Sequence, residues 1–150
     1  MVMPEIPDSV VVACPRCLTA NRVPRARLGE EPKCGKCGAA VLDAQPVTLD
    51  ETTFDSYLGR TELPVVVDFW APWCGPCRAM APAFERVAGE LRTHVRFAKV
   101  NTEEAQGLGA RFAIRAIPTM IVFRGSRELE RVSGALDARS IVQLASRHAA

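Results

Sequence analysis

The six cysteines are the residues of this sequence best suited to metal binding or redox chemistry, and they fall into three CxxC pairs. Two pairs lie near the N-terminus with sixteen residues between them, and one lies far downstream: Cys14 and Cys17, Cys34 and Cys37, and Cys74 and Cys77. Two CxxC pairs at this spacing are typical of a tetrahedral metal site, whereas an isolated pair is typical of reversible disulfide chemistry. The spacing therefore predicts two separate chemistries in one chain.

The downstream pair belongs to the segment Cys74-Gly75-Pro76-Cys77, placed between an apolar run and a helical pattern. A thiol at the start of a helix faces unpaired N–H groups and the positive end of the helix dipole, which stabilise its anion. Cys74 is therefore the predicted nucleophile, and Cys77 is the thiol that resolves the mixed disulfide. Pro76 suits the first helical turn, where a missing N–H costs nothing. The alternative, half of another metal site, lacks a second CxxC pair to complete it.

Residues 14–37 hold too few large apolar side chains to form a core, and several proline and glycine residues interrupt them. Four thiolates at the spacing of the two N-terminal CxxC pairs match a structural zinc ribbon, in which metal binding supplies the free energy of folding. Rubredoxin-like iron would use the same ligand geometry, and two extra redox disulfides would also fit the count. We expect structural Zn²⁺ on Cys14, Cys17, Cys34 and Cys37.

Asp68 interrupts the apolar run Val65–Trp70, six residues before the predicted nucleophile. Burial disfavours an ionised carboxylate, so we expect its pKa to be raised and its carboxyl group to exchange a proton with Cys77, directly or through a water molecule. A position at the frayed end of the strand, facing solvent, is the alternative. Lys99, in the neighbouring strand pattern, would moderate the proton transfer of Asp68 if it lies beside it. An exposed position on an edge face is the alternative for Lys99.

Two prolines affect the backbone near these residues. Pro82 falls inside the helical pattern that follows Cys77 and should kink that helix, which is a structural effect. Pro118 stands before a predicted strand, in Ile117-Pro118-Thr119. A cis bond there would leave the Ile117 backbone free to pair with an extended substrate segment, but the spacing alone favours an ordinary trans proline.

The elements that must position these residues are indicated by the periodicity of the apolar side chains. Strand patterns alternate with helical ones early in the chain and form a hairpin around Gly125-Ser126 late in it, which predicts an α/β fold with a mixed central sheet. The expected elements are a strand at Val47–Leu49, a helix capped by Asp50, a strand at Val65–Trp70, a helix over Cys77–Leu91, a strand at Val95–Val100, a helix capped by Thr102, strands at Thr119–Phe123 and Glu128–Ser133, and a helix capped by Asp137.

Composition and charge narrow the class of protein. The chain has 150 residues, 48% hydrophobic and 24% charged, enough for one full core and a small appendage, so we expect a metal-binding module with linker at 1–45 and a catalytic domain at 46–150. A net charge of +2 without a run of like charges argues against nucleic-acid partners. No segment approaches the roughly 20 apolar residues of a membrane span, and acids near the start argue against a secretory signal. We expect a cytoplasmic protein without a membrane partner.

The run Asp68-Phe69-Trp70-Ala71-Pro72-Trp73-Cys74-Gly75-Pro76-Cys77, with Lys99-Val100-Asn101, Ile117-Pro118-Thr119 and Gly134-Ala135 downstream, resembles the thioredoxin family. The resemblance covers about residues 46–150 and implies the thioredoxin fold, a mixed central sheet flanked by helices. It implies that Cys74 attacks, that Cys77 resolves, that Asp68 and Lys99 handle protons and that Pro118 is cis. It also implies an apolar rim that docks substrate proteins and the flavoprotein thioredoxin reductase, made of Trp73, Gly75, Pro76, Ile117, Pro118, Gly134 and Ala135.

The N-terminal cysteine pairs resemble the zinc-binding extension of the thioredoxin-2 subgroup of bacteria. Together the two resemblances imply a protein disulfide reductase that binds no organic cofactor and receives electrons indirectly from NADPH through thioredoxin reductase. Two alternatives remain: a disulfide isomerase or oxidase with a less negative reduction potential, and a zinc-dependent binding module or holdase whose cysteines only sense oxidation. We expect a monomer.

Overall fold

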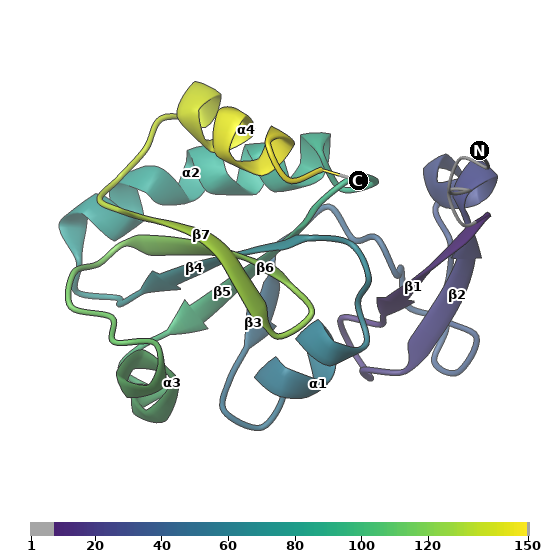
Figure 1. Cartoon of the computed structure of the whole chain (residues 1–150), viewed down its shortest axis with the longest axis horizontal. Coiled ribbons are helices and arrows are strands. Elements are labelled where there is room, and N and C mark those ends of the chain that lie inside the picture. Colours follow the sequence, from purple (N-terminus) through teal and green to yellow (C-terminus); the bar gives the residue numbers. More distant parts are fainter. Residues whose placement is uncertain (1–7, 150) are drawn as a thin grey trace, which may run out of the picture.

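The computed structural model describes residues 8–149, which form a five-stranded sheet flanked by helices and a smaller N-terminal hairpin at its side (Figure 1). We refer to residues 8–45 as the N-terminal region and to residues 46–149 as the C-terminal region. The elements are β1 (Ser9–Ala13), β2 (Ala20–Pro24), the 3₁₀ helix η1 (Arg25–Glu30), β3 (Val47–Leu49), α1 (Phe54–Gly59), β4 (Val65–Trp70), α2 (Gly75–Glu90), β5 (Arg96–Asn101), α3 (Gln106–Arg111), β6 (Thr119–Arg124), β7 (Arg127–Ser133) and α4 (Ala138–Ser146).

The large sheet has the strand order β3-β5-β4-β6-β7 and is mixed, as predicted. Strands β3, β5 and β4 are parallel, whereas β6 is antiparallel to both β4 and β7. Helices α2 and α4 lie on one face of the sheet, and α1 and α3 lie on the other (Figure 1). Because β4 is covered on both faces, its sequence is a nearly continuous apolar run instead of an alternating one.

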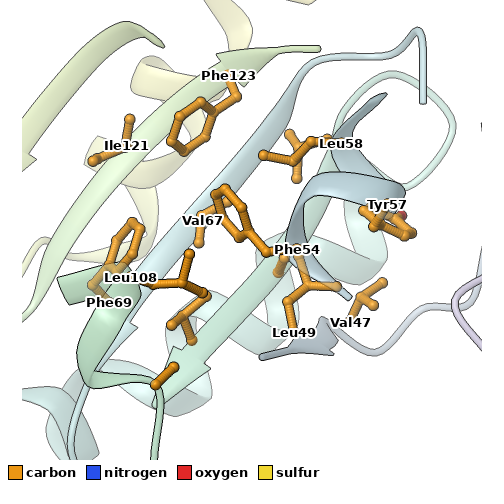
Figure 2. Packing of buried hydrophobic residues seen from close by; sticks show 14 of the residues in the cluster. Val47, Leu49, Phe54, Tyr57, Leu58, Val67, Phe69, Leu108, Ile121 and Phe123 are labelled. Atoms are coloured by element: carbon orange, nitrogen blue, oxygen red, sulfur yellow. The ribbon is translucent and has the colours of Figure 1, made fainter. Parts of the chain in front are cut away.

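Alternate side chains of β4 enter different halves of the core. Val65, Val67 and Phe69 join the cluster beneath α1 and α3, and Val66 joins the cluster beneath α2 and α4. Figure 2 shows the first of these clusters, in which Phe54 of α1 meets Phe123 of β6 at a ring distance of 5.6 Å. Since side chains along a strand alternate between its two faces, Asp68 shares the face of Val66, which α2 covers.

Three helix starts differ from the sequence prediction. Helix α3 begins at Gln106 and not after Thr102, because the Thr102 hydroxyl donates to the Trp70 carbonyl, 3.0 Å away, and holds a loop instead. Asp50 accepts from the N–H groups of Thr52 and Thr53 in a turn that precedes α1. Helix α2 begins at Gly75, so it includes the CGPC segment from its second residue. Asp137, by contrast, caps α4 as predicted, accepting from Ser140 N–H at 2.8 Å.

The N-terminal region packs against the segment between α1 and β4. Backbone N–H of Glu62 donates to the Val11 carbonyl at 2.8 Å, and the Thr61 hydroxyl accepts from Ala13 N–H at 3.1 Å. Leu63 is buried in the same cluster as Val10 and Val12 of β1. This region therefore docks on the C-terminal region through both hydrogen bonds and an apolar contact.

Within residues 8–149, the structure contains no helix that combines the length and the apolar character needed to cross a lipid bilayer.

Candidate functional site

The chain turns sharply after β4 and places Cys74 at the N-cap of α2. Cys74 has extended backbone angles, φ −82° and ψ 111°, and its sulfur accepts from Cys77 N–H at 3.2 Å. Pro76 occupies the first turn of the helix, where an N–H would have no intrahelical partner. The Cys74 sulfur thus faces the positive end of a sixteen-residue helix, which stabilises negative charge on it.

Cys74 and Cys77 lie at disulfide distance, with their Cα atoms 5.2 Å apart. Both are buried in a small cluster with Ala71, and the half-buried side chains of Trp70 and Ile117 pack against it. The Cys74 sulfur also lies 3.7 Å from the Ile117 carbonyl oxygen. This geometry allows the pair to interconvert between a dithiol and a disulfide without moving the backbone far.

Asp68 is buried, 1% exposed, and both its carboxylate oxygens lack a hydrogen-bond partner within residues 8–149. Burial raises the pKa of this carboxyl group to about 7, although the positive charge of Lys99 acts in the opposite direction. A group that titrates near neutral pH can both accept and return a proton under physiological conditions. The solvent-facing alternative for Asp68 is therefore wrong.

Lys99 of β5 is the direct register partner of Asp68 in β4. It is half-buried, and its ammonium group lies 4.6 Å from the centre of the Trp70 ring. A cation over an aromatic face is stabilised by the ring quadrupole, and from there the charge of Lys99 lowers the pKa of Asp68 without a hydrogen bond between them. The exposed edge position considered for Lys99 is wrong.

Pro118 lies beside the cysteine pair and precedes β6. The Ile117–Pro118 peptide bond is cis, as the family resemblance implied and contrary to what the spacing alone favoured. The Pro118 carbonyl accepts from Gly134 N–H at 2.8 Å, and Gly134 has φ +99°, a conformation that favours glycine. This bond brings the end of β7 next to Pro118.

The predicted docking residues lie around the cysteine pair. Trp73 is 65% exposed and is the one large apolar side chain so exposed among residues 8–149. Gly75 and Pro76 are exposed at the start of α2, and Gly134 and Ala135 are exposed after β7, whereas Ile117 is half-buried and Pro118 is buried. An exposed tryptophan next to a reactive pair is a typical contact for another protein.

A groove of ≈ 410 Å³ lies between Trp73 and Ile117 on one side and α3 with its following loop on the other. Thr102, Gln106, Ile114 and Arg115 contribute to its wall. None of these four was predicted from the sequence to line a site. No local sequence pattern marks them, because they line one groove only after folding has brought the segments that carry them together.

The four N-terminal cysteines form a second, separate cluster. Their sulfur atoms all lie within 4.8 Å of one another, with Cys14 and Cys37 at 3.5 Å and Cys17 and Cys34 at 3.6 Å. Tetrahedral zinc bonded to sulfur at about 2.3 Å requires sulfur atoms about 3.8 Å apart, so the donor set fits this metal. The cluster brings together all four residues predicted as ligands.

Each of these CxxC pairs lies in a tight turn and not at a helix. The turns are closed by hydrogen bonds from Leu18 N–H to the Cys14 carbonyl and from Gly38 N–H to the Cys34 carbonyl, both at 2.9 Å. Leu18 and Gly38 have positive φ values, 66° and 78°, which reverse the chain after each pair. The sulfur atoms of one turn therefore face those of the other.

The thiols of this cluster differ in acidity. Backbone N–H groups of Cys37 and Lys36 lower the pKa of Cys34 to about 6, and the Thr19 hydroxyl lowers the pKa of Cys17. Burial raises the pKa of Cys14 to about 11. A thiol like that of Cys14 loses its proton at neutral pH only beside a cation, which is the environment that a bound divalent metal supplies.

Arg96 of β5 is an unpredicted contact between the two regions. It is 1% exposed, and its guanidinium donates to the Tyr57 hydroxyl at 3.3 Å and to the Asp43 carbonyl at 3.1 Å. One guanidinium nitrogen remains buried without a partner within the described part of the chain. Arg96 therefore ties the end of the N-terminal region to the large sheet while leaving a buried cation incompletely paired.

Comparison with known protein families finds two matches. Residues 45–147 match the family described as thioredoxin, and residues 13–39 match the family described as thioredoxin 2, N-terminal, a zinc ribbon.

Individual relatives and solved structures carry the same description. The chain is 40% identical to thioredoxin C-3 of Corynebacterium nephridii over 134 residues, 89% of this chain and 92% of that protein. It is 36% identical to the chloroplastic M-type thioredoxin of Chlamydomonas reinhardtii, over 87% of this chain and 97% of the relative. A mutant thioredoxin from Halobacterium salinarum superimposes with a TM-score of 0.65 at 27% identity, covering 71% of this chain and 93% of that structure.

Proposed function

Because the chain belongs to the thioredoxin family, we propose that it reduces disulfides in client proteins with Cys74 as the attacking thiol and Cys77 as the resolving thiol. It is a thiol-disulfide oxidoreductase with the thioredoxin fold, and its relatives identify it as a disulfide reductase. The observation that supports the two roles is the position of Cys74 at the N-cap of α2, where its sulfur accepts from Cys77 N–H.

The reaction consists of two exchanges. The Cys74 thiolate attacks one sulfur of the client disulfide, a Cys74–client bond forms, and the other client sulfur leaves as a thiolate that takes up a proton. Cys77 then loses its proton and attacks the Cys74 sulfur, so the Cys74–Cys77 disulfide forms and the second client thiolate leaves. Two electrons pass from the protein to its client.

We assign proton transfer to Asp68, whose buried carboxyl group has a pKa of about 7. In this assignment it accepts the proton of Cys77 during the second exchange and returns it when the pair is reduced again. Lys99, the direct neighbour of Asp68 across β4 and β5, favours the ionised carboxylate and so limits the rise in pKa that burial causes. Pro118 and Ile117 position the client beside Cys74, with Trp73, Gly75, Pro76, Gly134 and Ala135 as the docking rim.

We assign the N-terminal cluster to structural zinc, held by Cys14, Cys17, Cys34 and Cys37. The four-thiol donor set at tetrahedral spacing and the match to a zinc-ribbon family support this assignment. Zinc held by these four thiols would connect the two turns and would supply folding free energy to a region with a small core. The family matches also support a division into a metal-binding module at 1–45 and a catalytic domain at 46–150.

Thioredoxins in general act on disulfide-containing proteins and are re-reduced by a partner enzyme. For this chain we assign that role to a flavoprotein thioredoxin reductase that draws electrons from NADPH, and we propose that the protein works as a monomer. Four clustered thiols at metal-binding spacing suit a reducing compartment, which supports the cytoplasm as its location.

The reduction potential of the Cys74–Cys77 pair tests the proposal. We would equilibrate the zinc-loaded protein in thiol-disulfide buffers and follow the fluorescence of Trp70 and Trp73, with the Cys74→Ser variant as a control that has no transition. A potential below about −230 mV supports a reductase, and one between about −180 and −120 mV would instead indicate an isomerase or oxidase. Absence of a reversible transition would contradict both and favour a binding module.

A further inference from the structure

Arg115 is an unpaired positive charge on the wall of the groove beside Cys74. Its side chain is exposed, and it makes no hydrogen bond or ion pair within the part of the chain that the structure describes. By contrast, Arg111, which is also near this groove, is paired with Asp55 at 2.9 Å, and Arg131 is paired with Glu128 at 2.6 Å. Arg115 therefore has its full charge available for another molecule.

The remaining groove wall is uncharged. Thr102 and Gln106 already use donor groups internally, the Thr102 hydroxyl on the Trp70 carbonyl and the Gln106 amide on the Glu103 carbonyl. Trp73, Ile114 and Ile117 supply apolar surface, and none of the described lining residues is acidic. A segment lying in this groove would meet apolar surface and one cation without a counterion.

We propose that Arg115 selects client segments that carry an aspartate or glutamate close to the cysteine under attack. This inference rests on the proposed function, because the client cysteine must sit at the Cys74 sulfur. That sulfur is 3.7 Å from the Ile117 carbonyl, and Arg115 is two residues away from Ile117 along the chain. An extended segment advances about 3.3 Å per residue, so the acidic side chain lies about two to four residues from the client cysteine.

The ion pair between Arg115 and the client carboxylate would be exposed to solvent, and this exposure limits how much it changes the rate of reduction. Exposed ion pairs change equilibrium and rate constants by about two- to fivefold, and salt screens them. We expect the second-order rate of reduction to rise by this factor for an acidic client segment. The preference should shrink at high ionic strength, since apolar contacts in the groove do not share that dependence.

The test uses the full-length, zinc-loaded, reduced protein and three disulfide peptides that differ only in a glutamate, glutamine or lysine three residues from the cysteine. We expect wild-type rates in the order glutamate, glutamine, lysine. The Arg115→Gln variant should reduce all three equally, and Arg115→Glu should prefer the lysine peptide. This reversal is a readout that a merely structural role of Arg115 would not produce.

A matched variant controls for general charge. Arg127→Gln removes an exposed arginine at the β6–β7 turn, outside the groove. It should keep the glutamate preference. Equal wild-type rates for the three peptides, or a preference that survives Arg115→Gln or disappears in Arg127→Gln, would overturn the inference. Failure to reduce any peptide would overturn the proposed function itself, and the inference with it.

Discussion

The same four-residue motif occurs three times in this chain, in two regions that use it differently. At Cys14, Cys34 and Cys74 alike, the first sulfur accepts a backbone N–H from a residue two or three positions later, at 3.2 to 3.5 Å. In the N-terminal region the chain then reverses in a tight turn, whereas after Cys74 it continues as α2. The backbone beyond the motif therefore decides its chemistry: a turn makes two pairs face each other, and a helix gives a single pair the field of its N-terminus.

The two regions also differ in how they are held together. The C-terminal region has apolar clusters on both faces of its sheet, with several phenylalanine rings between 5 and 6 Å apart. The buried cluster of the N-terminal region is smaller and includes Cys14 and Cys34. It is completed by Leu63, which belongs to the C-terminal region. We infer that apolar burial stabilises one region and metal ligation stabilises the other.

Of the changes considered, removal of the metal should produce the largest difference in stability between the two regions. Structural zinc contributes on the order of 10 kcal/mol to folding in small zinc modules, so a strong chelator should unfold the N-terminal region. Hydrogen exchange should show lost protection in β1 and β2 and retained protection in β4. Disulfide reduction should stay within about threefold of the zinc-loaded rate, since the Cys74–Cys77 pair packs in its own cluster. Equal loss of protection in both regions would contradict the separation.

Serine substitutions should separate the two cysteine sets by activity. Cys74→Ser removes the nucleophile and should lower turnover by about a thousandfold or more. Cys77→Ser should accumulate a mixed disulfide with a client, visible as an adduct by mass spectrometry, because resolution is blocked. Cys37→Ser is the matched control from the metal cluster: it should lose zinc but keep turnover. A Cys37→Ser variant as inactive as Cys74→Ser would show that disulfide reduction depends on the metal cluster, which contradicts the separation of the two cysteine sets.

Asp68→Asn should stabilise the protein, and the gain should depend on pH. The folded pKa of Asp68 is about 7, above the ordinary value of 3.8, so the folded state holds a proton that the unfolded state releases between those values. Wild-type stability therefore falls as pH rises from about 4 to about 7, by about 2–4 kcal/mol from this group. Urea unfolding at pH 4 and pH 8 should show the Asn variant more stable only at pH 8. A gain of the same size at both pH values would contradict the assignment.

Arg96→Met should have the smallest effect on global stability and a local effect on the connection between the regions. The methionine keeps much of the buried stem but loses the bonds to the Tyr57 hydroxyl and the Asp43 carbonyl. Relief of the unpaired buried nitrogen offsets part of that loss, leaving a change of about 1 kcal/mol. Hydrogen exchange should accelerate in residues 43–46. Unchanged exchange there would show that Arg96 does not anchor the linker.

Sequence reasoning predicted those parts of the molecule in which a local pattern determines the outcome. The apolar run Val65–Trp70, the CGPC segment and the Asp137 cap were all predictable because their neighbours along the chain specify them. The cap predicted at Thr102 is wrong because its hydroxyl instead bonds to Trp70, thirty-two residues away. A cap prediction considers only nearby N–H groups and cannot include such a partner.

Other residues depend on contacts that no local pattern contains. Arg96 occupies an ordinary strand position in the sequence, and its burial depends on Tyr57 and Asp43, which reach it from separate segments. Arg115 becomes notable only once the fold has brought Trp73 and Thr102 to the same groove. The metal cluster was predictable as a set of ligands, but its docking through Thr61 and Leu63 was not.

The separation of the two chemistries is tested most directly by counting zinc and thiols through one catalytic cycle. The reduced, zinc-loaded protein would be mixed with an excess of an oxidised client, with zinc release followed by a chromogenic chelator and the new disulfides mapped by peptide mass spectrometry. The account predicts one disulfide per molecule, between Cys74 and Cys77, with zinc retained. Stoichiometric zinc release, or disulfides among Cys14, Cys17, Cys34 and Cys37 at the rate of client reduction, would contradict it.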